Sequence, residues 1–267
     1  MVSVIIPTYN RGYCLHKAVT SVLEQTYKDL EVIIIDDGST DETPSVISSF
    51  KDSRVSFIRL DDNKGVSYAR NIGMKMSKGE FIAFQDSDDY WHPEKLEEQM
   101  VCMKNNNADF CYTYIRHMLP NNESVLVPDE NEPLEQKNGH IYGRLLVENM
   151  IGAPTLLMKR ECFCEIGGFD EKMPALEDWD YVLRLSKKYL ACFVPKPLFD
   201  ATYSEKSISR NIVHRIMATC MIIGRYKQDM IRYNVFDYHV KQIVAESQEI
   251  GMEEDIVNFL KKCITLL

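Results

Sequence analysis

The first hundred residues alternate short apolar runs with stretches in which apolar side chains recur at helical spacing. Four runs rich in β-branched and aromatic residues predict β-strands at residues 2–7, 30–35, 55–60 and 80–84. The segments between them predict amphipathic helices, one of them from the apolar positions Leu15, Ala18, Val19, Val22 and Leu23. This β-α-β-α-β-α-β order predicts an α/β fold with an open, mostly parallel sheet flanked by helices.

Two of these helices carry signals for where they begin. Ser39 and Glu42 have the spacing of a capping box, which predicts a helix over residues 40–50 with Ser39 as its N-cap. Pro93 suits the first turn of a helix, and the pattern after it predicts a helix that continues through Met103.

The second half of the chain is less regular. Further strands are expected at residues 108–115, 124–127, 153–159 and 190–194, and a helix at residues 178–188. The polar, proline-containing stretch 119–139 predicts a surface loop. From residue 205 to the end the pattern is helical. The predicted organisation is therefore one α/β domain over 1–204 with a C-terminal helical appendage over 205–267.

Polar and acidic residues follow three of the four N-terminal strands. These segments are Pro7-Thr8-Tyr9-Asn10-Arg11, Asp36-Asp37-Gly38-Ser39 and Asp86-Ser87-Asp88-Asp89. Open parallel sheets bind ligands outside the carboxyl ends of their strands, so these segments mark the expected site.

The chain contains neither a GxGxxG nor a GxxxxGK[ST] motif, so a glycine-rich phosphate cradle is not expected. A divalent cation held by carboxylates can neutralise a diphosphate instead. Asp86 and Asp88 follow a strand that is buried on both faces, and crowded carboxylates repel one another unless a cation joins them. A metal or ligand site there is favoured over a solvated surface turn.

Three further candidates have a structural alternative. Asp37 could stabilise a turn, or it could accept hydrogen bonds from a nucleotide base or ribose. Asp178 could complement a helix dipole, or it could act as a general base. Arg70 could form a surface ion pair or contact a diphosphate.

Composition excludes several classes of protein. Lys and Arg number 31 against 40 Asp and Glu, a net charge of −9, which disfavours nucleic-acid binding through phosphate contacts. The eight cysteines include no CxxC pair and are expected to be reduced thiols. No apolar run approaches the ~20 residues of a membrane span, and the N-terminus lacks a signal-peptide pattern. A cytoplasmic protein is expected.

Five segments, taken together and in this order, resemble the family 2 glycosyltransferases. They are SVIIPTYNR, VIIIDDGSTDET, DNKGVSYARNIG, GEFIAFQDSDDYW and ALEDWD, and they lie within about residues 1–200. The resemblance implies the GT-A fold of nucleotide-diphospho-sugar transferases. It implies sugar transfer from a nucleotide-sugar, foremost a UDP-sugar, to an acceptor hydroxyl, usually with inversion, with Mg²⁺ or Mn²⁺ as cofactor.

The resemblance also implies roles for individual residues. Residues 1–105 would form the nucleotide-sugar-binding half and residues 106–204 the half that holds the acceptor and the catalytic base. Asp88 would be the direct metal ligand and Asp86 would lie nearer the ribose, while Asp178 would be the base with Glu177 beside it. The base and ribose site would contain Pro7, Thr8, Tyr9, Arg11 and Asp37.

The chain departs from the family pattern in two places. It has no Q-x-x-R-W motif, which argues for transfer of a single sugar rather than processive synthesis. The Tyr-Arg-x-His segment of many members corresponds to residues 201–205 here, and its histidine is missing.

The expected setting is bacterial surface polysaccharide synthesis, with a saccharide or lipid-linked saccharide acceptor. Peripheral contact of the helical tail with the inner membrane surface stays open, and the sequence does not indicate the oligomeric state. Two rival functions remain. One is a non-catalytic nucleotide-sugar-binding protein. The other is a sugar-phosphate nucleotidyltransferase, which should carry a glycine-rich basic loop after the first strand, and PTYNRGYC is not one.

Overall fold

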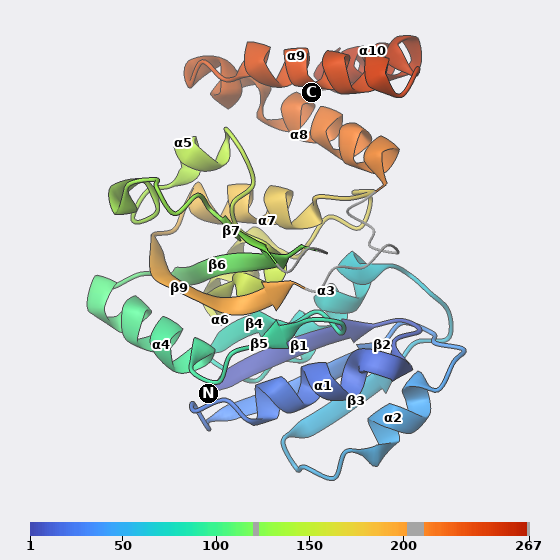
Figure 1. The fold of residues 1–267 in the computed structure, drawn as a ribbon, viewed down its shortest axis with the longest axis vertical. Helices are drawn as coiled ribbons and strands as arrows, with labels where there is room; N and C mark the ends of the chain where they lie inside the picture. The colour runs from blue at the N-terminus through green and yellow to red at the C-terminus, as the bar shows by residue number, and fades with distance from the viewer. Residues whose placement is uncertain (120–122, 202–210, 266–267) are drawn as a thin grey trace.

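The computed structural model describes residues 1–119, 123–201 and 211–265. It consists of a mixed β-sheet with helices on both sides and a separate layer of C-terminal helices (Figure 1). The sheet order is β3-β2-β1-β4-β8-β6-β9-β5, and β7 pairs with β6. The α/β fold with flanking helices and a helical C-terminal part is confirmed.

The N-terminal half follows the predicted alternation. Its strands β1 to β4 pair in parallel, because each crossover between them is a helix. β1 is buried along its whole length, because it lies between β2 and β4 inside the sheet. The elements are β1 (Val2–Thr8), α1 (Gly12–Leu23), β2 (Leu30–Asp36), α2 (Thr43–Ser49), β3 (Val55–Arg59), α3 (Val66–Met76) and β4 (Phe81–Phe84).

The predicted start of α2 is wrong. The helix begins at Thr43, and the Asp41 side chain accepts from the Thr43 backbone N–H at 2.9 Å. The hydroxyl of Ser39 instead accepts from the backbone N–H of Asn10 at 2.9 Å. Ser39 therefore joins two loops at the sheet edge rather than capping the helix. The other helix with a predicted start, α4 (Lys95–Asn106), begins two residues after Pro93.

The second half adds strands of mixed direction. β6 (Phe110–Met118) and β7 (Ser124–Val127) form a hairpin, and β9 (Ala191–Ala201) runs parallel to β6. β8 (Leu157–Lys159) is antiparallel to both β4 and β6, so it joins the two halves of the sheet. The mostly parallel arrangement thus holds within the N-terminal half. The helices here are α5 (Tyr142–Leu145), α6 (Arg160–Ile166) and α7 (Glu177–Ser186).

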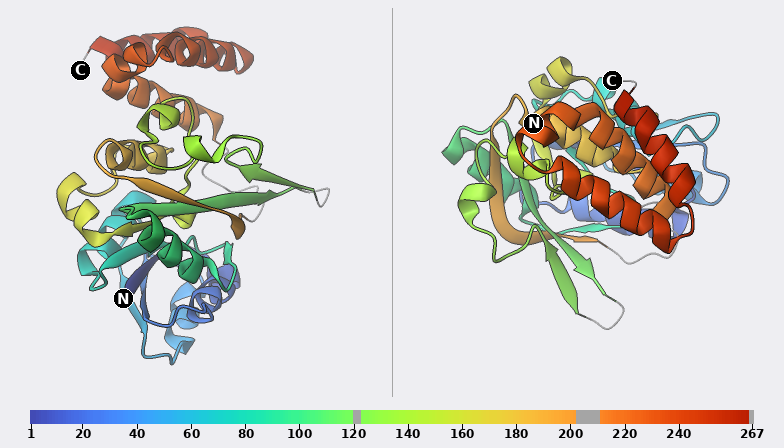
Figure 2. Two further views of the ribbon diagram at one scale, coloured as in Figure 1. Left: turned by 90° about the vertical axis from the view of Figure 1, so that its left-hand side faces the viewer. Right: turned by 90° about the horizontal axis from the view of Figure 1, so that it is seen from above.

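Two strands of this half differ in extent from the predictions. The strand expected over 153–159 is shorter, because Ala153–Thr155 forms a 3-10 turn containing Pro154 and only β8 remains extended. β9 continues seven residues past the predicted end at 194, despite two prolines, since it pairs with β6 and with the unpredicted strand β5 (Tyr90–Trp91). The hairpin β6–β7 projects from the body of the molecule (Figure 2).

The C-terminal helices pack over α5 and α7 (Figures 1 and 2). They are α8 (Ile212–Arg232), α9 (Phe236–Glu249) and α10 (Glu253–Thr265). Ile216 and Ile223 of α8 share one hydrophobic cluster with Trp179 of α7. Among the described residues, no helix combines the length and apolarity that crossing a membrane requires. The segment 201–205, apart from Ala201, lies outside the described residues.

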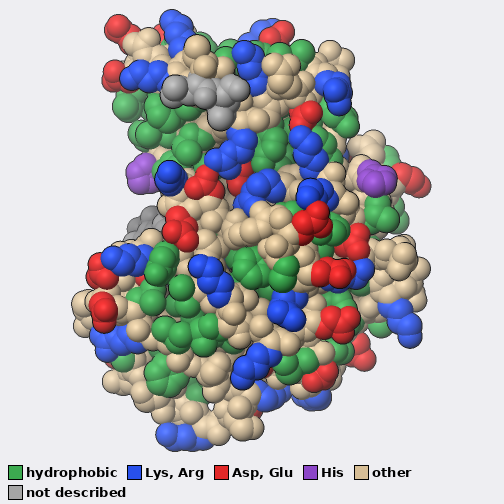
Figure 3. Space-filling model, turned by 180° about the vertical axis from the view of Figure 1, so that it is seen from behind, with side chains coloured by type: hydrophobic (Ala, Val, Ile, Leu, Met, Phe, Trp, Pro, Cys, Tyr) green, Lys and Arg blue, Asp and Glu red, His purple; other side chains and the backbone are tan. Residues whose placement is uncertain are grey.

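The surface seen from behind carries charges of both signs. Lys and Arg side chains lie among Asp and Glu side chains over this face (Figure 3). An extended basic surface of the kind that binds nucleic acid is therefore absent from the part of this face that the structure describes.

Candidate active site

Arg70 connects carboxylates from the two halves of the chain. It lies on α3 with its side chain only 4% exposed. Its Nη2 donates to Asp86 Oδ1 at 2.8 Å, and its Nη1 donates to Glu177 Oε1 at 2.7 Å. Burial alone would lower the pKa of Arg70, but the two carboxylates outweigh it and raise the pKa. Arg70 is thus an internal bridge rather than a surface ion-pair residue.

Asp88 lies beside this bridge and is paired with Arg11. The Arg11 Nε is 3.4 Å from Asp88 Oδ2. Burial, and then the neighbouring Asp86 carboxylate, raises the pKa of Asp88. A carboxylate whose ionisation is disfavoured by a neighbouring carboxylate fits a divalent cation, and carboxylate oxygens are the donors that Mg²⁺ and Mn²⁺ prefer. The residues present therefore suit the expected metal.

Two polar side chains lie side by side at the carboxyl ends of β1 and β2. Thr8 and Asp36 are register partners in the parallel pair. The Thr8 Oγ1 and the Asp36 Oδ2 are buried, and neither has a hydrogen-bond partner among the described residues. Buried polar atoms are nearly always paired, so this arrangement indicates a polar ligand. Asp36 lies in a segment predicted to mark the site, but the base contact was predicted for Asp37; the signal for Asp36 is its place as the last residue of a buried strand.

Asp37 holds the loop that leads into α3. Its Oδ1 accepts from the backbone N–H of Lys64, and its Oδ2 accepts from that of Gly65, both at 2.8 Å. Burial raises the pKa of Asp37, although the two amides act against it. Gly65 has φ +94°, a conformation that favours glycine. Asp37 therefore has a structural role in the loop, whatever else it contacts.

The remaining predicted donor-site residues surround this point. Pro7 is buried within β1, and Tyr9 is 43% exposed directly after it. Asn10, which the sequence analysis did not single out, has φ +52°. Its Oδ1 accepts from the backbone N–H of Thr40 at 2.8 Å, which holds the loop after β1 against the loop after β2.

Asp178 lies in the first turn of α7, next to Glu177. Its Oδ1 accepts from the backbone N–H of Trp179 at 2.7 Å and from Asn149 Nδ2 at 3.0 Å. Burial, and then the charge of Glu177, raises the pKa of Asp178 to about 7. A helix N-terminus by itself would lower it. A carboxylate whose pKa is near the working pH suits a general base better than a helix cap.

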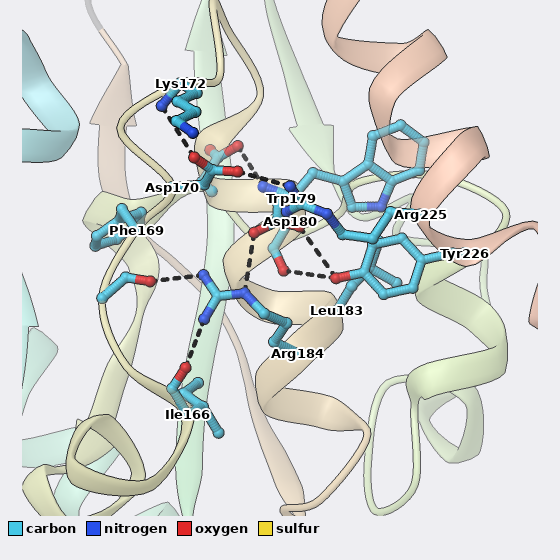
Figure 4. Close-up of polar contacts among 12 residues, drawn as sticks. Ile166, Phe169, Asp170, Lys172, Trp179, Asp180, Leu183, Arg184, Arg225 and Tyr226 are labelled. Carbon is cyan, nitrogen blue, oxygen red and sulfur yellow. Dashed lines mark hydrogen bonds and ion pairs between the residues drawn. The ribbon is translucent and has the colours of Figure 1, made fainter. Parts of the chain in front are cut away.

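A second network holds α7 from the opposite side (Figure 4). Asp180 is fully buried, and its Oδ2 accepts from Arg184 Nε at 3.0 Å. From α8, the Tyr226 hydroxyl donates to Asp180 Oδ1 at 3.1 Å, and Arg225 also pairs with that carboxylate. Arg225 reaches further to Asp170 Oδ2 at 2.6 Å. The C-terminal helices are thereby tied to the helix that carries Asp178.

Comparison with known proteins gives a consistent family. The model of glycosyl transferase family 2 matches residues 3–161. An uncharacterized glycosyltransferase of Haemophilus influenzae is 31% identical over 250 residues, which cover 92% of this chain and 83% of that protein. The Escherichia coli protein WfaP is 36% identical over 188 residues, 70% of this chain and 69% of its own. It is described as a UDP-Glc:alpha-D-GlcNAc-diphosphoundecaprenol beta-1,3-glucosyltransferase.

Solved structures show the same fold. S. aureus TarS in complex with UDP-GlcNAc aligns with a TM-score of 0.71 at 18% identity, over 98% of this chain and 81% of that chain. The mannosyltransferase PcManGT from Pyrobaculum calidifontis, in complex with GDP-Man and Mn²⁺, aligns with a TM-score of 0.68 at 17% identity. That alignment covers 96% of this chain and 74% of the other. The architecture is therefore the GT-A fold.

Proposed function

The chain belongs to glycosyl transferase family 2, and we propose that it moves one sugar from a UDP-sugar to an acceptor hydroxyl with inversion. The single observation that carries this proposal is the Arg70 bridge. Arg70 links Asp86, in the segment after β4, to Glu177, which lies 107 residues from Arg70 in sequence. Glu177 is next to the candidate base Asp178. Donor-binding and acceptor-activating groups thus share one electrostatic cluster. The donor half would be 1–105 and the acceptor half 106–204, with 205–267 as the helical appendage.

Thr8 and Asp36 would bind the nucleoside, since each offers a buried polar atom without a hydrogen-bond partner among the described residues, although Arg59 Nε lies 3.7 Å from Asp36 Oδ2. Asp36 would accept from a base N–H, and Asp37 would shape the site through the loop at Lys64 and Gly65. Tyr9, Pro7 and Arg11 would border the base and ribose. The names of relatives such as WfaP, which uses UDP-Glc, support UDP as the carrier.

Asp88 would hold Mg²⁺ or Mn²⁺, with Asp86 nearer the ribose. When bound, the ion would offset the negative charge of the departing diphosphate. Arg70 holds Asp86 in place, because its guanidinium is buried and is bound to a carboxylate on each side. Arg11 pairs with Asp88 and limits repulsion between the acids.

Asp178 would take the proton of the acceptor hydroxyl as that oxygen attacks the anomeric carbon opposite the leaving group. Trp179 and Asn149 both bond Oδ1 and so orient the carboxylate. Oδ2 would then receive the proton. Because the site would hold donor and acceptor together, their positioning would lower part of the activation barrier.

The acceptor would be a saccharide, free or lipid-linked, in bacterial surface polysaccharide synthesis. WfaP and WfgD of Escherichia coli are named for an alpha-D-GlcNAc-diphosphoundecaprenol acceptor, which supports a protein that works at the inner face of the membrane through peripheral contact. A non-catalytic nucleotide-sugar-binding protein remains the second candidate. Family membership disfavours a sugar-phosphate nucleotidyltransferase.

The deciding experiment measures UDP release from UDP-glucose and UDP-N-acetylglucosamine with Mn²⁺, with and without octyl α-N-acetylglucosaminide as acceptor. Acceptor-dependent UDP release and a β-linked product would support the proposal. Donor binding without turnover, by both wild type and Asp178→Asn, would favour the non-catalytic candidate.

A further inference from the structure

A groove of about 720 Å³ opens between the projecting hairpin and the segment that follows α5. One wall is the strand β7, and the other comprises Glu148 and Asn149, with Glu130 at the rim. We call it the hairpin groove. Its volume lies within the range of ordinary small-molecule sites. The hairpin projects from the body of the molecule (Figure 2), and Val125 on this wall is 49% exposed.

Two contacts connect the groove to the candidate base. Asn149 lines the groove, and its Nδ2 donates to Asp178 Oδ1 at 3.0 Å. Val127, also in the lining, pairs in register with Ile115 of β6. A Cβ placed on Gly152 would lie 3.1 Å from Ile115 Cδ1 and 3.8 Å from Asp178 Oδ2. Asn149 thus connects the lining directly to Asp178 Oδ1, whereas Ile115 and Gly152 lie between Val127 and Asp178 Oδ2.

The lining combines an apolar wall with carboxylates. Val125 and Val127, which share one face of β7, give the apolar surface, and Asp129, Glu130 and Glu148 give the acidic one. A pyranose presents apolar C–H faces and a rim of hydroxyl donors, which match these two surfaces. The carboxylates would repel a diphosphate. Arg144 pairs with Glu148 and Glu132, so Asp129 and Glu130 are the carboxylates of the lining that Arg144 leaves uncompensated.

We propose that the hairpin groove binds the sugar of the acceptor, with β7 against its apolar face, Asn149 at the end of the groove that approaches Asp178, and the reacting hydroxyl directed to Asp178 Oδ2. This inference rests on the proposed function, because it gives that reaction its acceptor site. It commits to a neutral, hydroxyl-bearing sugar and leaves any diphosphate or lipid portion outside the groove.

The test fills the groove without disturbing the fold. Val125 is 49% exposed and lines the groove, whereas Val101 is 52% exposed on α4, away from it. Val125→Trp and Val101→Trp are therefore a matched pair. With UDP-glucose, Mn²⁺ and octyl α-N-acetylglucosaminide, Val125→Trp should raise the acceptor KM about tenfold or more. The donor KM should change less than about twofold, and Val101→Trp should behave as the wild type.

If Val125→Trp is active and leaves the acceptor KM unchanged, the proposal that the hairpin groove binds the acceptor is wrong. If the wild type shows no transfer, the proposed function fails by itself, and calorimetry then tests whether the groove binds the sugar. Octyl α-N-acetylglucosaminide should bind the wild type in the presence of UDP and Mn²⁺, and Val125→Trp should abolish that binding. Octyl diphosphate, which lacks a sugar, should bind both proteins equally. Absence of sugar binding by the wild type, or a loss confined to octyl diphosphate, would refute the proposal.

Discussion

Arg225, on the C-terminal helix α8, forms an ion pair with Asp180, which lies two residues after Asp178 in α7. Asp180 is fully buried, so its charge depends on Arg225, Arg184 and Tyr226 for compensation. The C-terminal helices therefore act on the candidate base helix directly, through a charged contact rather than apolar packing alone.

Removing the Arg225 guanidinium should destabilise the protein. Arg225→Met leaves Asp180 with two of its three side-chain partners, so we expect a loss of about 1–3 kcal/mol, the range for a hydrogen bond to a charged group. Chemical denaturation measures it. Arg215 pairs with Glu246 at 3.4 Å on the exposed side of the same helix. Arg215→Met should cost under about 1 kcal/mol, and equal losses for both variants would contradict this view.

Arg70→Lys should lose as much donor affinity as Arg70→Met. The guanidinium bonds two carboxylates in different directions, and an ammonium cannot reproduce that planar fork. Breaking a buried ion-pair network typically costs about 3–5 kcal/mol. We expect both variants to lose most donor affinity, as measured by titration with UDP and Mn²⁺. A lysine variant with native affinity would show that one contact suffices.

Asp178→Asn should lower kcat about 10²–10⁴-fold, because the amide cannot accept the acceptor proton. Its Oδ1 can still accept from Trp179 and Asn149, so the geometry should be kept. The dissociation constant of UDP should stay within about twofold. Initial rates and calorimetry give the two quantities. The exposed Asp237→Asn serves as the control, and an equal loss of kcat there would remove the special role of Asp178.

The activity should fall as pH drops through about 7, because only the ionised Asp178 can act as a base. Asn149→Ala removes a hydrogen bond to the charged form, so the acidic limb of kcat/KM should move to higher pH.

The stability of the fold should change with pH in the opposite direction to the activity. Since the folded pKa is raised, the ionised carboxylate destabilises the fold above neutrality. Asp178→Asn should therefore raise Tm at pH 8, with a gain that vanishes near pH 4.

Chelation should remove the stabilisation that UDP provides. With Mn²⁺, UDP at 100 times its dissociation constant stabilises a single-site protein by about 2.7 kcal/mol. We expect EDTA or Asp88→Ala to abolish the corresponding thermal shift, because Asp88 would hold the ion. Asp62→Ala, at an exposed carboxylate, should leave the shift intact. A full shift in Asp88→Ala would exclude Asp88 as the essential ligand.

Much of the N-terminal half could be predicted because its signals are local. The apolar runs of β1 and β2 are long enough to identify buried strands. Helical periodicity in the segments between the strands predicts the helices. The second half was predicted less well, because its strands are defined by their partners. β9 continues through Pro195 and Pro197 because β6 and β5 lie beside it.

The order of amino acids is enough to predict the sheet edge at which polar groups gather and the acids that follow β4. The separate roles of these groups depend on the folded structure. Asp36 and Asp37 are neighbours of the same type, yet Asp36 keeps a buried oxygen without a hydrogen-bond partner among the described residues, 3.7 Å from Arg59 Nε, and Asp37 is bonded to two backbone amides.

The pairing of Arg70 with Glu177 and the raised pKa of Asp178 have the same origin. Both depend on burial and on charges brought together from distant parts of the chain, and these are properties of the folded environment rather than of residue type.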